Sequence, residues 1–190
     1  QPFTSKLVMS NAGWFKYEWV WDKVTGTDAF NAKKRPLKSH ENILVFSVNG
    51  HQYNPQMTEA NKRNMRNRQK HYFKGSDGGV YGKLCPFVTD KDEAQRYPVS
   101  VFRYSNQNAE LHKDKRLHPT QKPVALYEYL IRTYTNEGDT VLDICAGSGT
   151  TGIAAMNTGR NAILIEKDAK YFEIIQRRIA DAQPSLLVTP

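Results

Sequence analysis

Residues 141–168 read VLDICAGSGTTGIAAMNTGRNAILIEKD, and this stretch decides the fold class. The apolar residues at 141–144 predict a strand, and helix-forming residues at 153–156 predict the helix that follows it. Between them lie three glycines, Gly147, Gly149 and Gly152. Glycines lack a Cβ atom, so they allow a sharp turn and a close approach of the backbone to a ligand. A bound cofactor is therefore expected at this turn.

A second apolar segment, 162–165, predicts another strand, and Glu166 follows it directly. This acid stands about twenty residues after the glycines, where a carboxylate can accept hydrogen bonds from both hydroxyls of a ribose. The stretch therefore predicts a βαβ unit that binds a nucleoside. Only 22 residues follow Asp168, enough for one helix over 171–179 and a polar tail. The other strands of the sheet are expected before residue 141, in a permuted order.

The rest of the chain shows weaker patterns. The expected elements are helices over 2–12 and 124–134 and strands over 16–23, 43–46 and 97–104. From His51 to about Arg116 helical or strand periodicity is mostly lost, which indicates an insertion. We divide the chain into a sheet-forming part at 1–50, an insertion at 51–116, a cofactor-binding part at 117–180 and a tail at 181–190.

Positive charge is concentrated in the insertion. The 190 residues contain 27 Lys and Arg against 19 Asp and Glu, and 13 of these bases but only 6 of these acids lie in 61–116. Local charge of this kind attracts a polyanion, and double-stranded DNA is the expected partner. We expect phosphate contacts from five cations of one segment: Lys62, Arg63, Arg66, Arg68 and Lys70. The alternative is a solvated charged stretch.

Several classes of protein are disfavoured by composition. Cys85 and Cys145 are far apart and lack CxxC spacing, so neither a disulfide framework nor a metal site is indicated. The sequence has no run of 18 apolar residues and no signal-peptide pattern, which predicts a cytoplasmic protein without membrane association.

The glycine turn alone also matches a dinucleotide-binding fingerprint, so an NAD-dependent oxidoreductase is one alternative. Asp143 argues for another cofactor, because an anion at the end of the first strand would repel a pyrophosphate and attract an ammonium or sulfonium group. S-adenosylmethionine carries both cations. The alternative for Asp143 is a structural role, in which it caps the turn by accepting hydrogen bonds from backbone N–H groups.

A second candidate segment lies just before the helix at 124–134. Residues 117–123 read LHPTQKP, and the two prolines keep this segment extended, so that His118, Thr120 and Lys122 can present polar groups to a ligand. The Lys122 ammonium could meet a ligand carboxylate. The alternative is a plain loop that leads into the helix.

These residues resemble a known family. HPTQKP, VLDICAGSGTTGIAA and GRNAILIEKDAKYFEIIQRRI resemble the carboxyl-terminal half of amino-group DNA methyltransferases, which modify adenine N6 or cytosine N4. The subgroup that the chain resembles is permuted: its catalytic motif comes first, a target-recognition region follows, and the cofactor motifs come last. The resemblance is specific over 117–180, moderate over 1–50 and absent over 51–116.

The resemblance implies an α/β fold with a Rossmann-like S-adenosylmethionine-dependent sheet, flanked by helices and carrying an inserted target-recognition region. It places Asp143 near the methionine ammonium and Glu166 on the ribose. The loop around the cofactor would be formed by Ala146, Gly147, Ser148, Gly149 and Thr150. His118, Thr120 and Lys122 would line the methionine side.

The family's catalytic motif, Asp, Asn or Ser followed by Pro-Pro and an aromatic residue, does not occur in the 190 residues. In the permuted order it belongs before Gln1, so the chain is expected to be a fragment that transfers little methyl by itself. Adenine N6 is the expected target. The alternatives are a cytosine-N4 methyltransferase and a non-catalytic DNA-binding module with the same fold.

Overall fold

The computed structural model describes residues 2–59, 95–106 and 117–182. The chain forms two compact units, one made of Gln1–Asn54 with Val99–Pro190 and the other of Pro55–Pro98. In the smaller unit the described strands β3 (Thr58–Glu59) and β4 (Gln95–Arg96) pair in antiparallel fashion. The five cations expected to contact DNA, at positions 62–70, lie outside the described residues.

The larger unit contains a three-stranded sheet in the order β2-β1-β5. Strands β1 (Phe15–Thr27) and β2 (Lys38–Phe46) form an antiparallel hairpin, and β5 (Val101–Arg103) runs parallel to β1. Alternate residues of β1 are buried, among them Trp19 and Trp21. The two hairpin strands are longer than the sequence pattern predicts. β5 belongs to this sheet, although sequence analysis places its residues within the insertion at 51–116.

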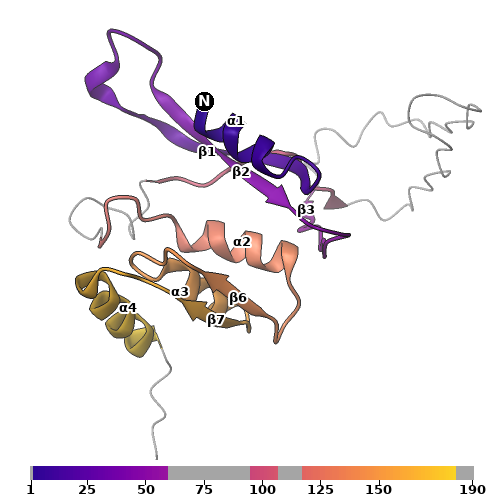
Figure 1. The fold of residues 1–190 in the computed structure, drawn as a ribbon, viewed down its shortest axis with the longest axis vertical. Coiled ribbons are helices and arrows are strands. Elements are labelled where there is room, and N and C mark those ends of the chain that lie inside the picture. Colours follow the sequence, from indigo (N-terminus) through magenta and orange to yellow (C-terminus); the bar gives the residue numbers. More distant parts are fainter. Residues whose placement is uncertain (1, 60–94, 107–116, 183–190) are drawn as a thin grey trace, which may run out of the picture. The chain divides into compact units, whose positions relative to one another are not determined.

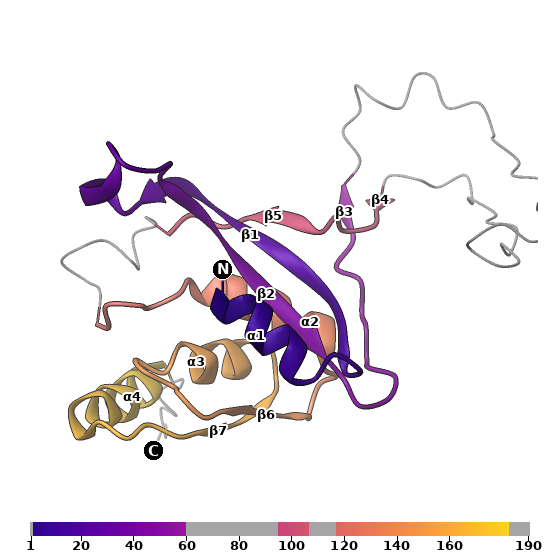
Figure 2. The same ribbon diagram turned by 45° about the horizontal axis from the view of Figure 1, so that its top comes forward.

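Helix α2 (Val124–Tyr134) covers a face of this sheet and also contacts α3 (Thr150–Asn157), as the two views in Figures 1 and 2 show. The Trp19 indole N–H donates a hydrogen bond to the Tyr134 hydroxyl at 2.5 Å. Ile131 of α2 packs against Ala154 and Ala155, which are fully buried. The small side chains of α3 allow the two helices to approach closely. α2 therefore links the two sheets of this unit.

The βαβ unit predicted from residues 141–168 is present. Strands β6 (Thr140–Asp143) and β7 (Asn161–Leu164) are parallel, with Leu142 opposite Ile163, and α3 connects them. Helix α4 (Ala169–Ala182) follows, and the short helix α1 (Pro2–Ser10) begins at a proline, as expected for a first helical turn. The predicted α/β class is confirmed.

One expectation about the sheet needs correction. The sequence pattern predicts that the early strands and the βαβ strands share one sheet. Within the described ranges, β6 and β7 form a two-stranded sheet of their own, separate from β2-β1-β5. The apolar pattern of a strand predicts that it is paired, but it carries no information about its partner. Leu142 and Ile163, which lie on one face of the β6–β7 pair, are more than half exposed.

Candidate cofactor site

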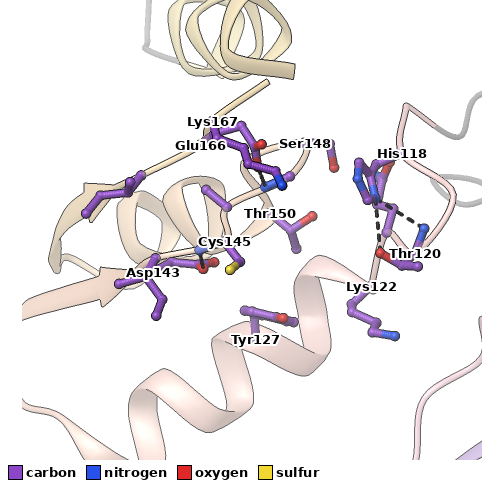
Figure 3. A pocket seen from close by; sticks show the side chains of 15 residues that line it. His118, Thr120, Lys122, Tyr127, Asp143, Cys145, Ser148, Thr150, Glu166 and Lys167 are labelled. Atoms are coloured by element: carbon purple, nitrogen blue, oxygen red, sulfur yellow. Dashed lines mark hydrogen bonds between the residues drawn. The ribbon is translucent and has the colours of Figure 1, made fainter. Parts of the chain in front are cut away.

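A cavity of about 460 Å³ lies where β6 and β7 end, next to the segment 117–123 and helix α2 (Figure 3). Its volume falls within the usual range for small-molecule sites. Nine of the ten residues predicted to bind a cofactor line it: His118, Thr120, Lys122, Asp143, Ala146, Gly147, Ser148, Thr150 and Glu166. Their roles as ligand-binding groups stay predictions. The structure brings together two segments that lie about 25 residues apart in the sequence.

The tenth residue, Gly149, is not among the lining residues. It has a φ of 78°, the left-handed conformation that favours glycine, and it precedes the first residue of α3. A Cβ atom at this position would lie 3.0 Å from Cγ1 of Ile175 on α4. Gly149 therefore shapes the turn and permits the packing of α4, and its contribution to the site is indirect.

Glu166 lies two residues beyond the end of β7 and closes the glycine turn. Its Oε2 accepts a hydrogen bond from the Gly147 backbone N–H at 2.8 Å, and its Oε1 accepts one from the Asp168 backbone N–H at 3.0 Å. Hydrogen bonds from the backbone of Asp168 and Gly147 hold the pKa of Glu166 below its usual value. The carboxylate is therefore fixed in position and ionised at neutral pH.

Asp143 ends β6 and also has internal partners. Its carboxylate accepts hydrogen bonds from the Cys145 backbone N–H at 3.0 Å and from the Thr151 hydroxyl at 2.5 Å. These contacts are the turn-capping role that sequence analysis leaves open as the alternative. Asp143 lines the cavity as well, so that a carboxylate held by the turn also contributes negative charge to the site.

His118 and Thr120 contact each other. The His118 Nδ1 atom lies 3.0 Å from the Thr120 hydroxyl and accepts the Thr120 backbone N–H at 3.2 Å. The imidazole also packs edge-on against Tyr171 of α4, with ring centroids 4.3 Å apart. The extended segment predicted from the two prolines therefore contains a local turn that is anchored on α4.

Lys122 is engaged by a residue that sequence analysis did not select. Its Nζ lies 2.9 Å from Oε2 of Glu41 on β2, while the Nζ of Lys23 on β1 lies 3.6 Å from Oε1 of the same carboxylate. The Lys122 ammonium also stands 5.6 Å from the ring centre of Trp21. This ammonium is thus partly neutralised before any ligand arrives. That Lys122 meets a ligand carboxylate stays a prediction.

Thr150, the first residue of α3, has a buried hydroxyl. Its side chain is 6% exposed and lines the cavity, and its Oγ1 has no hydrogen-bond partner within the described structure (Figure 3). A buried hydroxyl without a partner costs about 1–3 kcal/mol. A ligand group that accepted a hydrogen bond from this hydroxyl would remove this cost.

Other lining residues were missed by sequence analysis, among them Tyr127, Cys145 and Lys167. Burial raises the pKa of the Tyr127 hydroxyl, so this residue stays a neutral phenol. Tyr127 lies in the first turn of α2, four residues after Pro123. Its short distance along the chain from the HPTQKP segment is the sequence signal that could have placed it near the site. Among the described residues no group of three or more His, Cys, Asp or Glu side chains could hold a metal ion. No described helix is long and apolar enough to span a membrane.

The comparison with protein families identifies the class. Residues 4–177 match the family model of the N6- and N4-type DNA methylases, so the chain belongs to this family of DNA methylases. The family uses S-adenosylmethionine, and the predicted fold class and cofactor class are confirmed at this level.

Individual relatives agree with this assignment. The chain is 28% identical over 186 residues to the type II methyltransferase M1.MboII of Moraxella bovis, covering 90% of this chain and 66% of that protein. It is 48% identical over 62 residues to the DNA adenine methyltransferase YhdJ of Escherichia coli K12, covering 33% and 21%. The crystal structure of an M1.HpyAVI–SAM complex is similar with a TM-score of 0.58 and 26% identity, covering 94% of this chain and 68% of that one.

The chain spans only part of the curated relatives that it matches. The matched segments cover from 18% to 66% of their lengths.

Proposed function

We propose that the cavity at the ends of β6 and β7 binds S-adenosylmethionine, and that the protein uses it to methylate the exocyclic amine of adenine in double-stranded DNA. The observation that carries this proposal is the convergence of an ionised Glu166, the unpaired hydroxyl of Thr150 and the Gly147 turn on one cavity.

The residues of the cavity fit the parts of this cofactor. The Glu166 carboxylate uses one lone pair on each oxygen for the backbone, which leaves further lone pairs for two ribose hydroxyls. Asp143 brings negative charge near an ammonium group, and Thr150 offers a hydroxyl to a polar group of the ligand. When bound, the cofactor supplies an electrophilic methyl group. The protein contributes by fixing its orientation.

The acceptor is an exocyclic amine, whose lone pair is delocalised into the base. Transfer requires hydrogen-bond acceptors for the amine and an aromatic surface for an extruded base. The 190 residues do not contain the Asp/Asn-Pro-Pro-aromatic sequence that supplies these groups in the family. We propose that a segment preceding this sequence supplies them, as in the permuted order, and that the 190 residues alone transfer methyl slowly.

We further propose that the insertion at 51–116, apart from strand β5, recognises the DNA target. The high density of Lys and Arg at 62–70 supports this role. Adenine is preferred over cytosine because one relative, YhdJ, is named as an adenine methyltransferase. Cytosine N4 stays the alternative, since the family includes both types of enzyme. Family membership gives no support to the nicotinamide-dependent alternative.

The test is tritium transfer from labelled S-adenosylmethionine to unmethylated duplex DNA, followed by hydrolysis and chromatography of the nucleosides. The expected product is N6-methyladenine, formed slowly by the 190 residues and much faster when an upstream Asp/Asn-Pro-Pro-aromatic segment is included. Label in N4-methylcytosine would replace the adenine assignment. Efficient transfer by the 190 residues alone would contradict the proposed need for that segment.

A further inference from the structure

The loop that joins β1 to β2, together with the first residue of β2, is strongly basic, and we call it the hairpin tip (residues 28–38). In Figures 1 and 2 it lies at the closed end of the β1–β2 hairpin, where the chain turns from β1 to β2. Its centre is a short 3-10 helix, Ala29–Asn31. The site described above makes no use of the hairpin tip.

Asp28 gives the hairpin tip a defined conformation. Its backbone is left-handed, with a φ of 74°, and its carboxylate accepts hydrogen bonds from the side chains of Asn31, at 2.6 Å, and Arg35. Backbone N–H groups of Lys34 and Arg35 donate to the Asn31 carbonyl at 2.8 Å and 3.0 Å. The side chains of the hairpin tip therefore project from an ordered turn.

The exposed groups of the hairpin tip are of two kinds. Lys33, Lys34 and Lys38 are exposed cations, and Arg35 is paired with Asp28, the tip's single acid. Phe30 is fully exposed, at 102% of its reference surface. Leaving a phenylalanine in water forgoes about 1.5–3 kcal/mol of burial. An exposed aromatic ring on the same short loop as several exposed cations is suited to a partner that combines anionic groups with flat apolar surfaces.

We propose that the hairpin tip is a DNA-contacting element of this methylase, in which Lys33, Lys34 and Lys38 contact phosphates and Phe30 packs against a base. Nucleic acid is the partner whose chemistry matches, since phosphates alternate along its backbone with stacked aromatic bases. The major groove is also wide enough to admit a two-stranded β-ribbon. This inference rests on the proposed function, because it assigns a second contact to the same DNA substrate.

The test uses the full chain and a fluorescent 30-base-pair duplex, with binding measured by anisotropy from about 50 to 250 mM salt. Replacing Lys33, Lys34 and Lys38 together by alanine should weaken binding and lower the slope of log K against log salt by roughly 2–3 units. Phe30→Ala should weaken binding by about tenfold without changing that slope. The charge-matched control replaces Lys6, Lys170 and Arg177, which are exposed on α1 and α4, and should leave the slope unchanged.

S-adenosylhomocysteine binding, measured on every variant by calorimetry, separates the two proposals. If all variants bind this ligand like the parent chain, and the triple lysine variant keeps the parent slope, the hairpin tip does not contact DNA and the proposed function still stands. An unchanged affinity of Phe30→Ala would overturn the aromatic contact. Equal competition by poly-glutamate and duplex DNA would show a general anion surface and overturn the assignment to DNA. If the parent chain binds no duplex at low salt, both proposals fail.

Discussion

Glu41→Gln should destabilise the protein, because Glu41 joins β2 to the segment that lines the cofactor cavity. The side chains of Glu41 and Lys122 are 32% and 30% exposed, and that of Lys23 is 6% exposed. A hydrogen bond to a charged group contributes about 1.5–3 kcal/mol, and partial exposure moves this contact toward the lower end. Lys23 would lose the negative charge beside it, at 3.6 Å, and keep its hydrogen bond to the Thr27 hydroxyl, at 3.0 Å. We expect a loss of about 1.5–2.5 kcal/mol in the free energy of unfolding at pH 7.

The same pair predicts how this loss depends on pH. Burial alone raises the pKa of Glu41, but the hydrogen bond and charge of Lys122 and the charge of Lys23 outweigh it, so that the pKa lies below its usual 4.5. A carboxylate whose pKa is lowered by folding contributes stability above its unfolded pKa and loses it as the pH falls through the folded value. The difference between the parent and Glu41→Gln should therefore shrink below about pH 4.5.

The assay is urea unfolding followed by tryptophan fluorescence at pH 7 and at successively lower pH. Glu18→Gln is the matched control, because Glu18 is an exposed carboxylate on the neighbouring strand β1. A double-mutant cycle with Lys122→Met should give a coupling energy of about 1 kcal/mol. Equal stability of Glu41→Gln and Glu18→Gln at pH 7, or a loss that is the same at every pH, would refute the reasoning.

Three other substitutions or probes have clear expected outcomes. Thr150→Val should raise the free energy of unfolding by about 1 kcal/mol, because it removes a buried hydroxyl without a partner. It should also weaken S-adenosylhomocysteine binding in calorimetry, and a gain in affinity would contradict a hydrogen bond from this hydroxyl to the ligand. Cys145 is exposed and lines the cavity, so the cofactor should slow its alkylation by N-ethylmaleimide, with peptide mass spectrometry as the readout; an unchanged rate would place the ligand elsewhere. Val24 has a φ of 69°, which is unfavourable for a β-branched residue. Val24→Asn should therefore raise the melting temperature, and a lower melting temperature would show that this position is unstrained.

The βαβ unit was predictable because its signals are local. Apolar runs, the glycine turn and the acid after the second strand follow one another within 28 residues, and the structure reproduces β6, α3 and β7 close to the expected bounds. Pro123 likewise indicated the start of α2 at Val124. These signals arise from backbone geometry and depend little on distant partners.

Contacts between distant segments were not predictable in the same way. Glu41 and Lys122 are 81 positions apart, and neither hydrophobic periodicity nor a motif links them. The first residues of β2, at 38–42, read KSHEN and show no strand pattern. They form a strand because they pair with β1, which the local sequence does not reveal. The lone hydroxyl of Thr150 also depends on tertiary packing, which decides which buried groups lack a partner.

Calorimetric titration of S-adenosylhomocysteine into the parent chain and into Glu166→Gln tests the central claim most directly, since Glu166 is the carboxylate that the glycine turn holds in the cavity. The parent should bind one equivalent, and Glu166→Gln should bind roughly ten- to a hundredfold more weakly. Glu173→Gln, which changes an exposed carboxylate on α4, should bind like the parent. Equal affinity of all three proteins, with circular dichroism showing an intact fold, would contradict the placement of the cofactor.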